Sequence, residues 1–224
     1  MKYSNRGDKS TKEGFSEALI ELGSTYEDII LLGADITASV GMDGFASKFP
    51  NRFISLGIAE QNCIGVASGL ALSGKVPIFS TYGVFAALRT TDQIRISLCY
   101  NNIHAIIGGA HAGVSVGPDG ATHQALEDIA VLRSLPNMTI LSPADATQTK
   151  QATIAAYEQC KGPVYVRFGR AEVPDFMPPE IDYKVGKSQT LRKGNDISII
   201  ATGHMVWEAL VASELLLEMG ISAR

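Results

Sequence analysis

Short apolar runs alternate with helix-like segments through most of the chain, and this alternation constrains the fold more than any other feature. In 11–26, for example, Phe15 and Leu19 lie on one helical face, and the apolar run 29–33 follows. Such an order is typical of a parallel sheet, because parallel strands need crossover segments whose helices cover both sheet faces. We expect strands at 29–33, 53–56, 76–80, 103–109, 138–142 and 164–167, and helices at 11–26, 60–73, 83–99 and 145–160. The prediction is a doubly wound, mostly parallel α/β sheet of about six strands with helices on both faces.

The alternation stops after residue 170. The polar stretch 171–195 holds several prolines and glycines, which predicts a linker with one short strand at most. A strand at 197–201 and a helix at 205–219 are expected next, but one strand and one helix cannot bury a sheet on both faces. We therefore expect the chain to be a fragment, organised as a first domain at 1–175, a linker at 176–195, and the start of a second, truncated α/β domain at 196–224.

Composition and charge narrow the class of protein. A chain of 224 residues that is 46% hydrophobic can bury a full core. The net charge of −4 and the absence of a basic stripe disfavour nucleic acid as a partner. The first residues are polar and no apolar run has membrane-spanning length, so a cytoplasmic protein without a membrane partner is expected. Three widely spaced cysteines favour reduced thiols, and no metal site is expected.

Two nucleotide-binding signatures fail on inspection. Segment 69–75 has the glycine and lysine spacing of a P-loop, but Val76 replaces the Ser or Thr that would hold magnesium, and the segment runs from helix into strand. After the first apolar run, Asp35 stands where a dinucleotide pyrophosphate would approach. A nicotinamide-binding Rossmann domain is therefore only a weak alternative.

Two other segments carry candidate chemistry. Glu60 lies between a predicted strand and a predicted helix, where a carboxylate can manage a proton, although an ordinary first-turn acid facing water explains it as well. The glycine-rich segment 108–124 contains His111, Asp119 and His123, which can exchange hydrogen bonds with a hydroxylated substrate. Turn formation by Asp119 and a capping or surface role for His123 remain open alternatives.

Five motifs, in order, resemble the pyrimidine-binding domain of transketolase. They are Gly33-Ala34-Asp35-Ile36-Thr37, Gly57-Ile58-Ala59-Glu60-Gln61-Asn62, Ser80-Thr81-Tyr82-Gly83-Val84-Phe85, the segment from His111 to His123, and Arg133-Ser134-Leu135-Pro136-Asn137 followed by Pro143-Ala144-Asp145. The resemblance covers about residues 10–175, and the segment from about 190 resembles the opening of the family's C-terminal domain. The family's diphosphate-binding domain is not in this sequence, which fits a split arrangement in which two genes encode the two halves.

The resemblance implies a cofactor, thiamine diphosphate, and assigns residues to it. Glu60 matches the catalytic glutamate that bonds the cofactor's pyrimidine ring, and Tyr82 and Phe85 match the aromatic pocket around that ring. Leu88 stands where the family has a further aromatic residue, and core packing of Tyr82 and Phe85 is the alternative. Asp35 matches a residue near the cofactor and the dimer interface, although turn formation explains it equally well. The Mg²⁺ or Ca²⁺ of the cofactor would be bound mainly by the missing diphosphate-binding partner.

The resemblance also assigns substrate contacts. Asp119 and His123 match residues that contact the sugar hydroxyls, with His123 also catalytic. Ser39, His111 and Arg170 match the set that holds the substrate phosphate, although an arginine after a strand is as often merely solvated. A further phosphate-binding arginine of the family is not evident near the first helix, where the sequence is Thr11-Lys12-Glu13-Gly14.

The implied activity is transfer of a two-carbon ketol unit between sugar phosphates. The partner would be a transketolase N-terminal, diphosphate-binding subunit, without which this chain is expected to be inactive. The small-residue helix 60–73 predicts a homodimer of this chain. Alternatives are a domain like that of 1-deoxyxylulose-5-phosphate synthase, one like the β subunit of a 2-oxoacid dehydrogenase, and a non-catalytic assembly or regulatory module.

Overall fold

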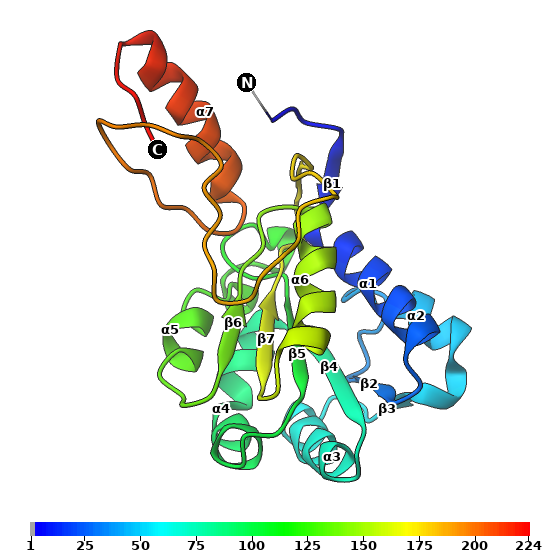
Figure 1. Cartoon of the computed structure of the whole chain (residues 1–224). Helices are drawn as coiled ribbons and strands as arrows, with labels where there is room; N and C mark the ends of the chain where they lie inside the picture. Colours follow the sequence, from blue (N-terminus) through cyan, green and yellow to red (C-terminus); the bar gives the residue numbers. More distant parts are fainter. Residues whose placement is uncertain (1–2) are drawn as a thin grey trace.

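The fold is built on a parallel six-stranded sheet. The computed structural model describes residues 3–224, and Figure 1 shows the sheet at the centre of the molecule. Its strands are β2 (Ile29–Gly33), β3 (Phe53–Ser55), β4 (Val76–Tyr82), β5 (Ile106–Ala110), β6 (Thr139–Leu141) and β7 (Val164–Arg167). They are arranged in the order β3-β2-β4-β5-β7-β6, and every neighbouring pair is parallel. The predicted doubly wound α/β sheet is confirmed.

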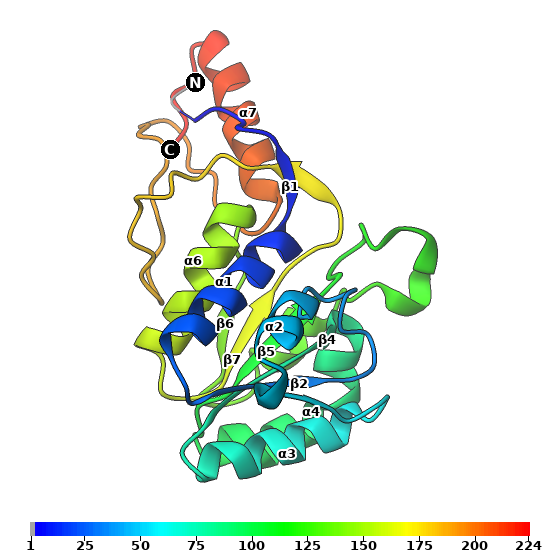
Figure 2. The same cartoon turned by 90° about the vertical axis from the view of Figure 1, so that its right-hand side faces the viewer.

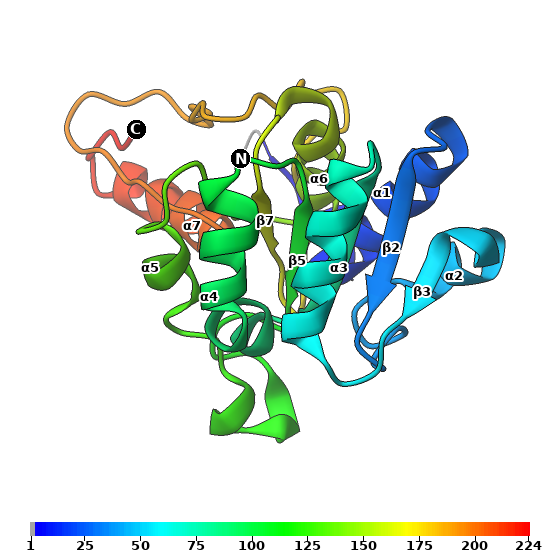
Figure 3. The same ribbon diagram turned by 90° about the horizontal axis from the view of Figure 1, so that it is seen from below.

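Helices cover both faces of the sheet, as Figures 2 and 3 show. One face packs against α1 (Thr11–Thr25), α2 (Asp43–Lys48) and α6 (Ala146–Gln159). The other packs against α3 (Glu60–Leu72), α5 (Asp128–Leu132) and a helical segment made of π-helical turns at Phe85–Arg89 and Ile94–Tyr100 on either side of α4 (Thr91–Gln93). Among residues 3–224, no helix combines the length and the apolarity needed to cross a bilayer.

Two helices on the first face, α1 and α6, begin where their sequences predict. The backbone N–H and the hydroxyl of Ser10 both donate to Oε1 of Glu13, which closes the start of α1. Asp145 accepts a hydrogen bond from the backbone of Gln148 at the start of α6. The two helices cross closely at Gly14, where a Cβ would overlap the carbonyl oxygen of Ala146. Glycine permits this close approach because it has no side chain.

The segment after β7 departs from the predicted alternation. The short strand expected in 171–195 is β8 (Glu172–Pro174), which pairs antiparallel with β1 (Asp8–Ser10). The strand expected at 197–201 is wrong: its only backbone pairing within residues 3–224 is with 222–224, where Arg224 N–H donates to Ile197 O at 2.8 Å. A strand requires a neighbouring backbone along its length, and this segment has none beyond that short pairing. The helix expected next is α7 (Met205–Glu218), which projects away from the sheet in Figure 1.

The parallel arrangement gathers the candidate residues at one edge of the sheet. Asp35, Glu60 and His111 follow the carboxyl ends of β2, β3 and β5, Tyr82 ends β4, and Arg170 follows β7. In open parallel sheets this edge is where ligands bind. The fold therefore brings residues that are distant in sequence to a common edge.

Candidate active site

Glu60 is buried at the first position of α3. Its side chain is 4% exposed, so the alternative of an ordinary first-turn acid facing water is wrong. Oε1 accepts a hydrogen bond from Nη1 of Arg89 at 2.7 Å. Among residues 3–224 the other carboxylate oxygen, Oε2, makes no hydrogen bond. A buried carboxylate with one committed and one available oxygen is ready to accept a hydrogen bond from a ligand.

A cluster of aromatic rings lies next to Arg89. The ring of Tyr82 stacks on that of His111, with centroids 4.5 Å apart and an interplanar angle of 21°. The ring of His123 lies edge-on to Tyr82 at 5.6 Å and to Phe85 at 5.3 Å. The guanidinium of Arg89 lies over the Phe85 ring at 4.1 Å. The predicted residues Tyr82, Phe85, His111 and His123 thus form one cluster, which Arg89 connects to Glu60.

His111 has an unusual backbone and a shifted pKa. It follows β5 with a φ of 54°, a left-handed conformation that costs energy for a residue with a side chain and is common at functional sites. Burial, with the nearby charges of Arg170 and Lys12, lowers the pKa of His111 to about 4. Its Nδ1 is buried without a hydrogen-bond partner in the described part of the chain. His111 is therefore a neutral imidazole at pH 7 with an unused polar atom.

Asp119 and Arg170 pair with each other. Nη1 of Arg170 lies 2.9 Å from Oδ2 of Asp119 and also donates to the carbonyl oxygen of Val116. Asp119 does not bond to His123, whose Nδ1 lies 2.9 Å from the hydroxyl of Thr122. Both partners of the ion pair are partly exposed, and such pairs contribute about 0–1 kcal/mol. A ligand anion can therefore compete with Asp119 for Arg170 at little cost.

Two predicted residues stand apart from the cluster. Within residues 3–224 no hydrogen bond or ring contact joins Asp35 to it; Asp35 is exposed and has a left-handed φ of 68°, as turn residues often do. Ser39 approaches through its backbone, which acts on His111 and offsets a small part of its lowered pKa. Leu88, the position where an aromatic residue was expected, is 39% exposed.

Sequence analysis missed two basic residues of the site. Arg89 lies one helical turn after Phe85, a spacing that could have drawn attention to it. Lys12 occupies the region where an additional arginine was sought, and its charge contributes to the lowered pKa of His111. A lysine thus supplies a cation near the site, with its side chain against Gly41.

Sequence analysis also missed a buried network beneath the site. Asp128, which is fully buried, accepts hydrogen bonds from the hydroxyl of Tyr165 at 2.9 Å and from Nε of Arg167 at 2.8 Å. Arg167 also donates to the carbonyl oxygen of Ala125. The network ties the end of β7 to the segment that follows His123, and no local sequence pattern indicates it.

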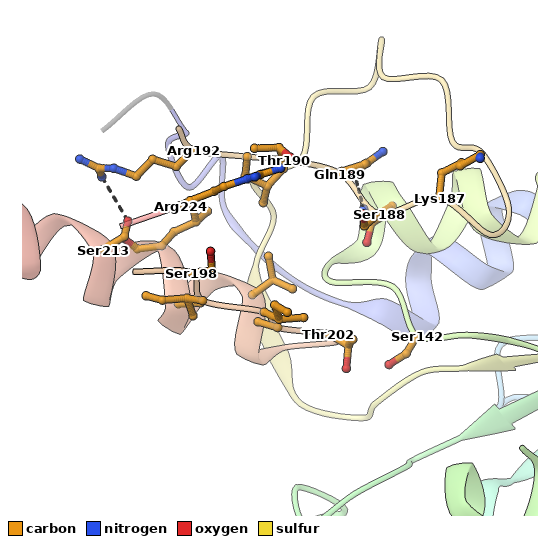
Figure 4. A pocket seen from close by; sticks show the side chains of 18 of the residues that line it. Ser142, Lys187, Ser188, Gln189, Thr190, Arg192, Ser198, Thr202, Ser213 and Arg224 are labelled. Carbon is orange, nitrogen blue, oxygen red and sulfur yellow. Dashed lines mark hydrogen bonds between the residues drawn. The ribbon is translucent and has the colours of Figure 1, made fainter. Parts of the chain in front are cut away.

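A separate cavity of about 540 Å³ lies away from this cluster. It lies between the extended segment 183–192 and residues 198–213, and Figure 4 shows Arg192 bonding to Ser213 on its wall. None of the predicted site residues lines it. The candidate active site is therefore the cluster at the carboxyl edge of the sheet.

Comparisons with known proteins agree with this fold. Residues 8–175 match the family model described as transketolase, pyrimidine binding domain, and residues 186–224 match the transketolase C-terminal domain. A protein of Methanocaldococcus jannaschii provisionally named transketolase C-terminal section is 45% identical over 219 residues, which cover 96% of this chain and 68% of that protein. One subunit of the apulose-4-phosphate transketolase of Phocaeicola vulgatus is 39% identical, over 95% of this chain and 68% of that polypeptide.

A solved structure gives the same result. The structure described as a split gene transketolase, inactive β4 tetramer, has a TM-score of 0.89 and 44% identity, covering 97% of this chain and 71% of that chain. The sheet domain of this chain is thus a pyrimidine-binding domain of the kind found in thiamine diphosphate-dependent enzymes. The chain belongs to the transketolase family, within which it matches the pyrimidine-binding domain and part of the C-terminal domain.

Proposed function

We propose that the chain is one subunit of a split transketolase that transfers a two-carbon ketol unit between sugar phosphates. The observation that carries the proposal is Glu60, a buried carboxylate whose Oε2 is available and whose Oε1 is connected through Arg89 to the aromatic cluster. The available oxygen of Glu60 suits a ligand that carries a hydrogen-bond donor, which favours a catalytic subunit over a non-catalytic assembly module.

The residues present fit thiamine diphosphate, the cofactor of this family. Oε2 of Glu60 would accept a hydrogen bond from the pyrimidine ring, and Tyr82 and Phe85 would flank the flat ring. When bound, the cofactor would supply a nucleophilic thiazolium carbon for the chemistry at the ketose carbonyl. Glu60 would thereby control where the pyrimidine ring carries its proton. The metal ion, Mg²⁺ or Ca²⁺, and the diphosphate would be held mainly by the partner subunit.

The substrate side of the site suits a phosphorylated sugar. His111 is neutral and can donate or accept at a hydroxyl. The imidazole of His123, which lies edge-on to the Tyr82 ring, would move a proton at a sugar oxygen bound beside it. The charges of Arg170 and Lys12, which act on His111, would attract a substrate phosphate. These contacts support a sugar phosphate over a substrate without hydroxyls.

Two kinds of partner are proposed. The first is a diphosphate-binding subunit, because the relative from Phocaeicola vulgatus is named as one subunit of its transketolase and the similar solved structure is described as a split gene transketolase. The second is another copy of this chain, joined through α3, whose Gly65 and Gly69 face open space. Ile58, just before α3, and Leu72, its last residue, are 73% and 74% exposed. Gly65→Glu would then reduce the mass measured by light scattering, and a monomeric wild-type chain at micromolar concentration would contradict the homodimer.

Reconstitution tests the activity. The chain is mixed with the diphosphate-binding subunit from the same genome, thiamine diphosphate, Mg²⁺, xylulose 5-phosphate and ribose 5-phosphate, and ketol transfer is followed. Transfer should require both subunits, and Glu60→Gln should nearly abolish it. Glu208→Gln, at an exposed glutamate in the first turn of α7, is the matched control and should be fully active. No transfer in any mixture would favour the non-catalytic module, and an active Glu60→Gln variant would refute the role of Glu60.

A further inference from the structure

Arg89 makes more contacts at the site than any role in solubility requires. Its Nη1 lies 2.7 Å from Oε1 of Glu60, its guanidinium lies over the ring of Phe85 at 4.1 Å, and its backbone carbonyl accepts a hydrogen bond from Nε2 of Gln61. Arg89 and Phe85 stand at the two ends of a π-helical turn. Proteins frequently keep such turns at functional sites. The start of α3 and this turn are thus joined at two points.

The ion pair gives the Glu60 carboxylate a defined orientation. The two oxygens of a free carboxylate are interchangeable by rotation, and the group samples several orientations. Bonding Oε1 to a guanidinium that is itself held against Phe85 removes that freedom and leaves Oε2 as the remaining acceptor. Because Arg89 is still 42% exposed, its methylene stem contributes little to the core and its role at Glu60 can be tested separately from packing.

We propose that Arg89 is a positioning residue for Glu60, which it holds so that Oε2 meets the pyrimidine ring of the cofactor. This proposal rests on the function proposed above and adds a residue to its machinery. Partners that orient a ligand-binding side chain typically change affinity by about 10-fold to 100-fold when they are removed. Arg89→Met, which keeps the length of the side chain but removes its donors, should therefore weaken thiamine diphosphate binding by about tenfold.

A double-mutant cycle separates positioning from a general structural role. Cofactor affinity is measured by titration calorimetry on the chain reconstituted with its diphosphate-binding subunit. If Arg89 acts through Glu60, Arg89→Met weakens binding about tenfold in the wild-type background but changes it by less than about twofold in the Glu60→Gln background. Arg89→Lys keeps the charge and should recover most of the affinity, although it loses the planar contact with Phe85.

The controls keep the outcomes distinct. Arg95→Met removes an exposed arginine of the neighbouring helical turn, which makes no ion pair within residues 3–224, and should leave affinity unchanged. Equal losses in the two Glu60 backgrounds, or no loss in either, would overturn the positioning role while leaving the proposed function standing. If the wild-type complex binds no cofactor, the proposed function and the role of Arg89 both fail. Should Arg89→Met fail to fold, the same cycle run with Arg89→Lys and with Arg89→Gln decides the question.

Discussion

Replacing Asp128 with alanine should destabilise the protein although Asp128 contacts no predicted ligand. The substitution removes the acceptor of two hydrogen bonds, one from the buried hydroxyl of Tyr165 and one from Nε of Arg167. Burial, followed by the charge of Asp128, raises the pKa of Tyr165 well above its ordinary value, so its hydroxyl is a donor at neutral pH. In the variant this donor would be left without a partner in the core.

The magnitude follows from the burial of the three groups. An unsatisfied buried hydroxyl costs about 1–3 kcal/mol. Breaking a fully buried ion pair costs about 3–5 kcal/mol, but the side chain of Arg167 is 22% exposed and can regain water, so we take about 1–2 kcal/mol for it. The free energy of unfolding should therefore fall by about 3 kcal/mol, which lowers the melting temperature by about 6–12 °C for a chain of this size.

The assay is thermal and urea unfolding of the chain, followed by circular dichroism. Tyr165→Phe removes the hydroxyl but leaves the pair of Asp128 and Arg167, so it should cost about 1–2 kcal/mol. Asp182→Ala is the matched control, because Asp182 pairs with Lys184 at 3.4 Å on the surface, where both side chains are largely exposed, and it should change stability by less than about 0.5 kcal/mol. A loss below about 1 kcal/mol for Asp128→Ala would refute the argument that the network holds the site.

Three further predictions follow from the site and the core. A Cβ on Gly109 would overlap the ring of Tyr165, so Gly109→Ala should lower the urea midpoint by an amount that corresponds to about 1–3 kcal/mol, and an unchanged midpoint would contradict this packing. Because the pKa of His111 is lowered to about 4 in the folded chain and is about 6.5 when unfolded, the unfolded chain binds the proton more readily between these values. The stabilising contribution of His111 is thus complete above about pH 6.5 and is lost as the pH falls towards 4, so His111→Gln should flatten the decline in urea midpoint between pH 7 and pH 5, and an equally steep decline in the variant would count against it. Glu60→Gln should leave the far-ultraviolet circular dichroism unchanged, since glutamine fills the same space; a loss of helical signal would show that Glu60 is needed for folding.

Local patterns in the sequence were sufficient for the strands and helices of the sheet. The apolar run at 29–33 and the helical spacing of Phe15 and Leu19 are properties of a few consecutive residues, and both elements are present where expected. The sequence also placed Glu60 and His111 after strands, and the parallel pairing of those strands brings their ends to one edge of the sheet. These inferences need no knowledge of which elements touch.

Contacts between distant elements could not be read in the same way. Glu60 and Arg89 are 29 residues apart, and Asp128 and Arg167 are 39 apart. The first pairing depends on how two helical segments pack together, and the second on how α5 packs against β7. The wrong strand at 197–201 has the same origin, because a strand is defined by the backbone beside it and not by its own residues.

The sequence by itself thus determined the strands and helices of the sheet domain, the parallel arrangement that their alternation predicts, and the types of side chain that follow the strands. Only the tertiary structure decided that Glu60 is buried, that Arg89 occupies one of its oxygens, and that Asp119 pairs with Arg170. The physical reason is range: helix and strand formation follow from neighbours within a few residues, whereas burial and ion pairing are set by side chains that only folding brings together.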